Sequence, residues 1–113
     1  MNAHHLHVAT EPFNAIMDRK KTIESRLCDE KRQAIQIGDT VFFTNRDNAT
    51  QMVEARVIRL LKYETFHELF SDNNPAKFGG PSVAWLENQI NEFYSLDSQR
   101  RQGVLGIEFE IIR

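Results

Sequence analysis

The chemically richest stretch of the chain is RKKTIESR, residues 19–26. Its cations precede a predicted strand on which Thr22, Glu24 and Arg26 share one face. An arginine fork and a lysine charge bind phosphate or carbonyl oxygens, and a carboxylate beside them can orient a ligand or transfer a proton. The stretch therefore predicts a polar cleft, or else a solvated strand face with a Glu–Arg pair, which is the commoner role of such charges.

Alternating and helical hydrophobic patterns predict the elements around this stretch. The expected strands are residues 4–9, 22–27, 40–45, 51–62 and 104–112. The expected helices are residues 11–18, 66–71 and 82–95, with residues 29–33 as a loop or a single helical turn and residues 96–102 as a polar link. The alternation of the long fourth strand slips near Ile58 to Leu61, which indicates a bulge or a sharp bend. This order of elements favours an α+β fold, a small bent barrel of about five strands with two to three flanking helices.

Length and composition narrow the class of protein. The chain has 113 residues, enough for one domain, which we expect to span residues 1–113. Its formal net charge of −2 does not indicate a strongly basic nucleic-acid binder, although it permits a local basic patch. The single cysteine, Cys28, cannot form an internal disulfide, and the sequence shows neither a bilayer-spanning apolar run nor a signal-peptide pattern at its start. We therefore expect a soluble, cytoplasmic protein.

Several motifs together resemble the activating signal cointegrator homology (ASCH) domain, a family of the PUA-like superfamily. The family pattern Gly-x-Lys-x-x-Glu-x-Arg is occupied by Lys21, Glu24 and Arg26, with Arg19 in the place of the glycine. The other matching features are a Gly-Asp turn at Gly38 and Asp39, the aromatic phrase YETFHELF with Tyr63 and Phe66, a helix that ends in Phe93 and Tyr94, and the closing strand GVLGIEFEI. The resemblance spans about residues 5–112.

The resemblance implies a PUA-like β-barrel whose cleft, lined by the Lys-x-x-Glu-x-Arg strand, holds RNA or a nucleoside-like ligand. One subgroup of the family hydrolyses the acetyl amide of N4-acetylcytidine, and a further member type is a ribonuclease. That amidohydrolase subgroup uses a Lys, a Thr three residues later and a distant Glu. Lys21 matches the Lys, Glu24 stands in the place of the Thr, Thr22 is a weak substitute on the same strand face, and Glu64 and Glu68 are candidates for the distant acid.

A binding module would use the same strand together with aromatic side chains. The expected ligand-binding residues are Lys20, Lys21, Glu24, Arg26, Tyr63 and Tyr94. A tyrosine can stack on a base and form a hydrogen bond, and Arg46, Arg100 and Arg101 could extend a phosphate-contacting rim. The remaining aromatic residues are expected in the core: Phe42, Phe43, Phe66, Phe70, Trp85, Phe93 and Phe109.

Among the N-terminal histidines, His5 and His7 share a strand face, but no third metal ligand lies nearby in the sequence. No metal and no other cofactor is therefore expected. Three functions remain open: a small RNA- or nucleotide-binding module, a hydrolase of a modified nucleoside or of RNA with Lys21 and Glu24 as catalytic residues, and a protein-interaction domain. The oligomeric state is not predicted.

Overall fold

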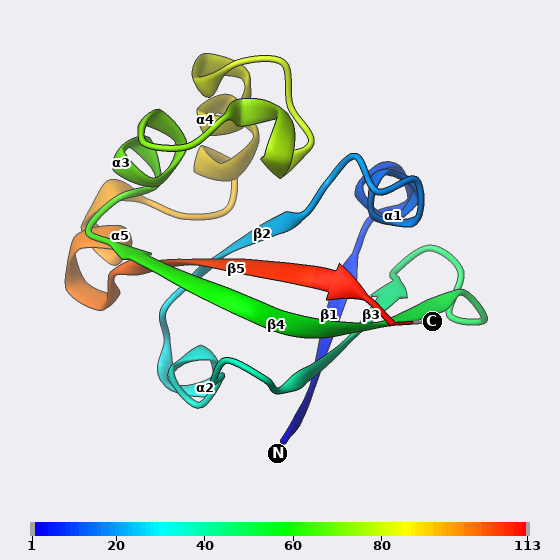
Figure 1. Cartoon of the computed structure of the whole chain (residues 1–113). Helices are drawn as coiled ribbons and strands as arrows, with labels where there is room; N and C mark the ends of the chain where they lie inside the picture. Colours follow the sequence, from blue (N-terminus) through cyan, green and yellow to red (C-terminus); the bar gives the residue numbers. More distant parts are fainter. Residues whose placement is uncertain (1, 113) are drawn as a thin grey trace.

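A strongly curved, five-stranded mixed sheet lies at the centre of the protein; this computed structural model describes residues 2–112 (Figure 1). The strands are β1 (Ala3–Val8), β2 (Ile23–Leu27), β3 (Thr40–Asn45), β4 (Met52–Tyr63) and β5 (Val104–Ile111). They lie in the order β1-β3-β4-β5-β2, with β1 parallel to β3 and every other neighbouring pair antiparallel. The five strands and the mixed pairing confirm the predicted α+β class.

The long strand β4 bends the sheet. Its first half pairs with β3, and its second half pairs with β5 as far as Tyr63 opposite Val104. The register between β4 and β5 shifts between Val57 and Arg59, so Ile58 is the extra residue of a bulge. The bulge predicted from the broken alternation is confirmed at this position.

Helices occupy the connections between strands. They are α1 (Thr10–Met17), α2 (Glu30–Gln33), α3 (Phe66–Ser71), a 3₁₀ helix η1 (Pro75–Phe78), α4 (Val83–Asn91) and α5 (Leu96–Gln102). The prediction of a polar link over residues 96–102 is wrong, because capping stabilises a helix there. The Ser95 side chain accepts a hydrogen bond from the Ser98 N–H, and Gly103, at a φ of 75°, ends the helix. No helix within residues 2–112 has both the length and the apolar character that crossing a membrane requires.

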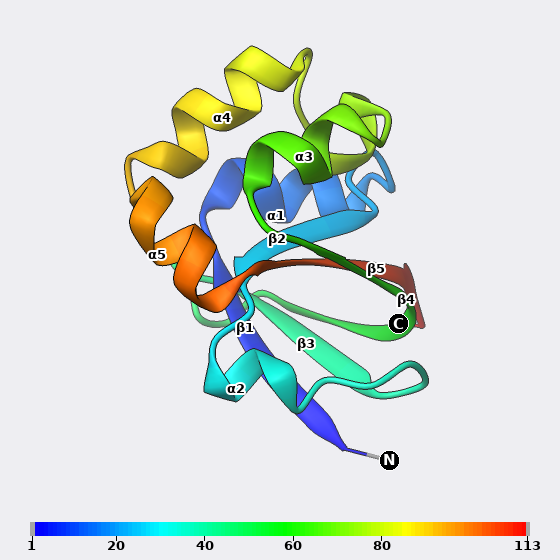
Figure 2. The same cartoon turned by 90° about the vertical axis from the view of Figure 1, so that its left-hand side faces the viewer.

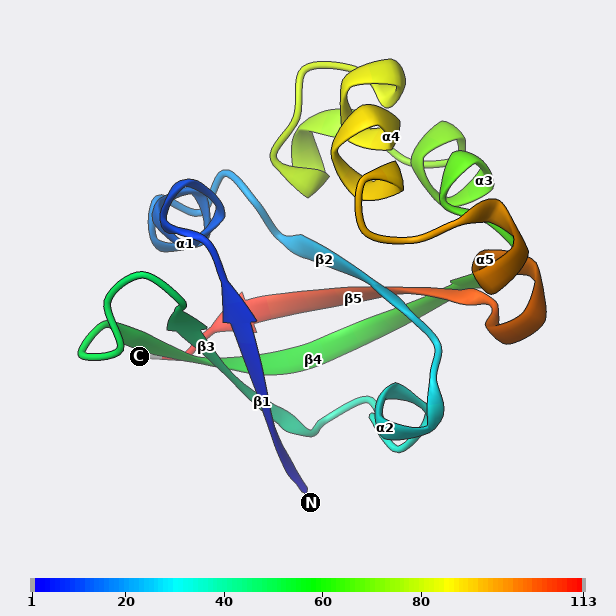
Figure 3. The ribbon, with the colours of Figure 1, turned by 180° about the vertical axis from the view of Figure 1, so that it is seen from behind.

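Two hydrophobic clusters hold these layers together. The larger one joins β1, β3, β4 and β5 to α1 and includes Leu6, Phe13, Phe43 and Phe109. The second joins β2 and the start of β5 to α3 and α4, through residues such as Ile23, Phe66, Phe70 and Leu86. The segment that carries α3, α4 and α5 leaves the end of β4 and returns to the start of β5, and it covers one end of the sheet (Figure 2). Seen from behind, α1 and α4 stand on the same side of the sheet with β2 between them, whereas α2 lies on the opposite side (Figure 3).

Candidate functional site

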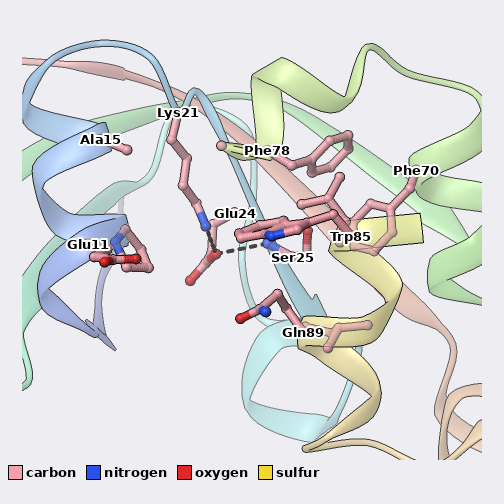
Figure 4. Close-up of a pocket in the computed structure, with 13 residues that line it drawn as sticks. Glu11, Ala15, Lys21, Glu24, Ser25, Phe70, Phe78, Trp85 and Gln89 are labelled. Atoms are coloured by element: carbon pink, nitrogen blue, oxygen red, sulfur yellow. Dashed lines mark hydrogen bonds and ion pairs between the residues drawn. The ribbon is translucent and has the colours of Figure 1, made fainter. Parts of the chain in front are cut away.

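A cleft of about 210 Å³ opens beside the free edge of β2, where α1 and α4 face each other (Figure 4). α1 contributes Glu11, Pro12 and Ala15 to one wall. The opposite wall consists of Phe70, Phe78, Gly79, Trp85, Leu86, Gln89 and Ile90. Between the walls lie Lys21, Glu24 and Ser25. Of the strand face predicted from the sequence, Glu24 lines this cleft and Arg26 lines the wider hollow beside it.

The end of α1 positions Lys21. The chain leaves the helix through a Schellman motif, in which Lys20 N–H donates to the Ala15 carbonyl and Arg19 N–H donates to the Ile16 carbonyl. Arg19 takes the left-handed conformation of this motif, with a φ of 60°, at the place where the pattern that the sequence resembles has glycine. Lys21 N–H also donates to the Ala15 carbonyl, which fixes the point from which the lysine side chain enters the cleft.

Lys21, Glu24 and Arg26 form a continuous ion-pair triad. Lys21 Nζ lies 2.9 Å from Glu24 Oε1, and Arg26 Nη2 lies 2.8 Å from Glu24 Oε2. Arg26 Nε donates to the same Oε2 at 3.1 Å, so two N–H groups of the guanidinium bind this one oxygen of Glu24. Arg26 Nη2 also donates to the His7 carbonyl at 2.8 Å, which ties β2 to β1 across the open side of the sheet.

The charge state of Glu24 follows from these partners. Its residue is 5% exposed, and burial alone would raise the pKa of its carboxyl group. The charges and hydrogen bonds of Lys21 and Arg26 outweigh burial and lower the pKa of Glu24 from 4.5 to about 2. Glu24 is therefore a stable anion at neutral pH and a weak base, which suits holding two cations in place better than abstracting a proton.

The free edge of β2 adds backbone groups to the cleft. The Thr22 carbonyl accepts a hydrogen bond from the Phe109 N–H of β5, and the Cys28 N–H donates to the carbonyl of Gly103, the residue before β5. Alternation along the strand then directs the N–H and C=O groups of Ser25 away from β5, towards the open edge. The Ser25 N–H donates to Glu24 Oε1 at 3.0 Å, and the Ser25 carbonyl lies on the edge that borders the cleft. The sequence placed Ser25 on the other strand face; it lines the cleft because the cleft lies beside the strand edge.

Trp85 forms the aromatic wall and is 42% exposed. Its ring lies beside buried Gly80, at which a Cβ atom would stand 2.7 Å from Trp85 Cε3 and 2.7 Å from Leu86 Cδ2. Leu86 lies on the buried stripe of α4, and Trp85, one position before it, lies off that stripe. Helical spacing in the sequence could therefore have indicated that Trp85 is exposed. Its prediction as a core residue is wrong.

The cleft widens towards a mouth lined by side chains of β1, the β3–β4 turn and the end of α4. The residues at this mouth beyond those already named include His7, Arg46, Asp47, Glu92, Phe93 and Tyr94. Phe93 is 68% exposed because α4 ends at Asn91 and the turn after it points the ring outwards, so the prediction of Phe93 in the core is also wrong. Tyr94 lines the mouth, and its ring stacks on Phe66 with centroids 5.7 Å apart.

The other predicted site residues lie outside this cleft. The exposed Lys20 does not line it, and Thr22 faces a shallow hollow with Ile16 and Phe109. Tyr63 packs against the second hydrophobic cluster. Glu64 is exposed before α3, and Glu68 accepts a hydrogen bond from the Thr65 side chain, so neither candidate for a distant acid lines the cleft. The acidic residue that α1 does bring to the cleft, Glu11, was not predicted.

Each N-terminal histidine has a separate environment. His4 Nε2 lies 2.8 Å from Asp39 Oδ2, His5 stacks on Phe42, and His7 lies at the cleft mouth. Within residues 2–112 no three His, Cys, Asp or Glu side chains come close enough to hold a metal ion. Arg46 reaches the mouth of the cleft, whereas Arg100 lines a different hollow and Arg101 pairs with Asp97.

Comparisons with known proteins identify relatives of this chain. The model of the ASCH domain matches residues 6–113. The hypothetical protein PH0355 is 27% identical in sequence to this chain. Its crystal structure superimposes with a TM-score of 0.85, and the match covers 99% of this chain and 100% of that one. PF0455 from Pyrococcus furiosus is 28% identical, with a TM-score of 0.76 and coverage of 100% and 99%. ASCH from Zymomonas mobilis shares the fold at 12% identity, with a TM-score of 0.67 over 94% of this chain and 65% of that one. No curated protein matches the chain.

Proposed function

The chain belongs to the ASCH domain family, and we propose that its cleft binds the base of a nucleoside or of an unpaired nucleotide in RNA. The observation that carries this proposal is the Lys21–Glu24–Arg26 triad beside the Trp85 ring, in which Glu24 is buried and the two cations are largely withdrawn from water. A base is flat, apolar on its faces and polar at its edge. The cleft has the matching arrangement, with an indole at one wall and hydrogen-bonding groups between the walls.

The triad keeps donors for a ligand. An ammonium group has three N–H donors and a guanidinium has five, so the bonds to Glu24 and His7 leave donors on Lys21 and Arg26. These donors suit a carbonyl oxygen on a base edge, and the Ser25 carbonyl suits an exocyclic amino group. Glu24 holds both cations in place, so the geometry does not depend on flexible surface side chains.

Binding can be measured directly, because Trp85 is the single tryptophan of the chain. We expect nucleosides, including N4-acetylcytidine, or short single-stranded RNA to quench its fluorescence and to give saturable heat in calorimetry. Trp85→Ala should weaken binding roughly tenfold, since a base stacked on an aromatic ring contributes ~1–3 kcal/mol. Met52→Ala is the matched control, because Met52 is exposed on β4 and lies outside the cleft.

Lys21→Ala tests the polar half of the cleft and should also weaken binding. Circular dichroism checks that this variant is folded. Equal affinity in wild type, Trp85→Ala and Lys21→Ala would contradict the proposed site. The absence of binding by every nucleoside and RNA would contradict the function and favour a protein-interaction domain.

A hydrolase of a modified nucleoside is the second candidate, favoured by the placement of Lys21 within the cleft, 2.9 Å from Glu24. Mass spectrometry of N4-acetylcytidine and of an RNA oligomer after incubation with the protein would detect the product. Glu24→Gln should abolish turnover if Glu24 takes part in proton transfer. Product formation that survives Glu24→Gln would remove Glu24 from the mechanism, and the absence of product with wild type would leave the binding function alone.

A further inference from the structure

The charges around the cleft mouth are mixed, and acidic side chains outnumber basic ones. The charged residues that line the cleft and its mouth are Glu11, Lys21, Glu24, Arg26, Arg46, Asp47 and Glu92. Four of these seven side chains are acidic and three are basic, so the lining of the cleft and its mouth carries a net charge of −1 at neutral pH. A site that binds phosphate normally presents an excess of Arg and Lys.

The acids differ in whether they already have partners. Glu24 is neutralised by Lys21 and Arg26, and Asp47 accepts hydrogen bonds from the Thr10 N–H and hydroxyl. Glu11 and Glu92 are exposed and make no ion pair or side-chain hydrogen bond with any other residue between 2 and 112. Their negative charges therefore act on whatever enters the mouth.

The direction in which a ligand enters decides what these two carboxylates face. A base that stacks on Trp85 and bonds to the triad lies inside the cleft, so its sugar and any 5′ substituent lie at the mouth. A 5′-phosphate carries a charge of roughly −1.5 to −2 at pH 7, and it would lie near Glu11 and Glu92. Arg46 is the one cation among the mouth residues that is not bound to Glu24, and it offsets only part of this repulsion.

We infer that the cleft selects an unphosphorylated nucleoside over the corresponding 5′-monophosphate, with Glu11 and Glu92 as the specificity-determining residues. This inference rests on the proposed function, because it assumes that a base occupies the cleft. It makes the ligand a free nucleoside rather than a nucleotide or a phosphate-rich strand.

The test compares four matched pairs by calorimetry: cytidine, uridine, adenosine and guanosine, each with its 5′-monophosphate. For charges about 8 Å apart in water at low salt, each carboxylate disfavours the monophosphate roughly fourfold. Wild type should bind the better nucleoside several-fold more tightly than its monophosphate. Glu11→Gln combined with Glu92→Gln should change this ratio roughly tenfold and invert the preference.

Glu30→Gln is the matched control, since it removes the same charge from α2 on the far side of the sheet (Figure 3) and should not change the ratio. Arg46→Gln should strengthen the preference for the nucleoside. Raising the salt concentration from about 10 mM to about 500 mM should reduce the discrimination in wild type, because screening shortens the Debye length to a few ångströms.

The outcomes separate this inference from the function beneath it. If nucleosides bind and their monophosphates bind equally well or better, the inference is overturned and the proposed function stands. If discrimination persists unchanged in the double variant, Glu11 and Glu92 are not its cause. If neither member of any pair binds, the proposed function fails and the inference falls with it.

Discussion

Glu24 is the residue on which the site depends, because a single carboxylate holds Lys21 and Arg26 and accepts the Ser25 N–H. All three charged side chains are largely withdrawn from water, with side-chain exposures of 11% for Lys21, 7% for Glu24 and 16% for Arg26. Removing one member of a buried ion pair leaves its partner charge without compensation. The triad therefore stabilises the fold as a unit and is sensitive to the loss of its central anion.

Glu24→Gln should lower the free energy of unfolding by about 3 kcal/mol at pH 7, measured by urea denaturation. The folded protein lowers the pKa of Glu24 from 4.5 to about 2, so this stabilisation is present above pH 4.5 and is lost as the pH falls towards 2. The stability difference between wild type and Glu24→Gln should shrink across that range. Asp39, whose pKa is also lowered, titrates in both proteins and cancels in the comparison. A difference that stays constant between pH 7 and pH 2 would show that the triad does not stabilise the fold through its charge.

The types and spacing of Lys21, Glu24 and Arg26 matched a known pattern and predicted a shared site, and their role in binding stays a prediction. Lys21, Glu24 and Arg26 do lie together, and alternation along one strand was sufficient to place two of them on one face. The sequence did not indicate that Tyr63 packs into a cluster, or that Phe93 lies beyond the end of α4. Those positions depend on where a helix ends and on contacts between distant segments, which local patterns do not determine.

At the scale of elements, the junction between α1 and β2 sets the direction of Lys21. The junction requires one left-handed residue, and the chain uses Arg19 there at a φ of 60°. A residue with a Cβ atom pays roughly 1–2 kcal/mol for that conformation, whereas glycine does not. The turn between α1 and β2 is therefore strained at Arg19, and this turn directs the Lys21 side chain into the cleft.

Arg19→Gly should raise the free energy of unfolding by about 0.5–1 kcal/mol, because relief of strain exceeds the added flexibility of the unfolded chain. Chemical denaturation measures the change. Lys20→Gly is the matched control; Lys20 has no left-handed backbone, so glycine there should destabilise by about 0.5–1 kcal/mol. Equal destabilisation by both substitutions would show that the turn at Arg19 stores no strain.

Element prediction succeeded where hydrophobic periodicity was clear and failed where polar capping decided. The five strands and the bulge at Ile58 followed from alternation. α5 was missed because LDSQRRQ has little apolar pattern, and its stability comes from Ser95 at the start and Gly103 at the end. Cys28 is buried just after β2, and a cytoplasmic location stays a prediction.

At the scale of the whole molecule, the two hydrophobic clusters divide the fold into a sheet with α1 and a helical segment over residues 64–103. The sheet cluster is built from four strands and α1, while the helical segment is held mainly through β2 and the start of β5. Regions with fewer buried contacts open locally at a lower free energy than the whole protein. The α4 wall of the cleft therefore belongs to the less stable part of the molecule.

Native-state hydrogen exchange should show this division. Amide groups in α3, α4 and α5 should exchange through an opening that requires less free energy than exchange in the paired region of β3, β4 and β5. A bound nucleoside should slow exchange in α4 more than in β3, because α4 lines the cleft. Identical exchange free energies in the helices and the central strands would mean that the molecule opens only as one unit.

The helical segment leaves the sheet after Tyr63 and re-enters it at Val104, and these two residues are direct partners across β4 and β5. A segment whose two ends join the sheet at one pair of opposed residues can be lengthened, shortened or exchanged during evolution without shifting the register of any strand. The triad has no such freedom, because β2 carries Glu24 and Arg26 and is paired along its length with β5. Among chains of this architecture, we therefore expect differences in ligand preference to arise in the α4 wall. The triad should change less, because it is fixed by the pairing of β2 in the sheet.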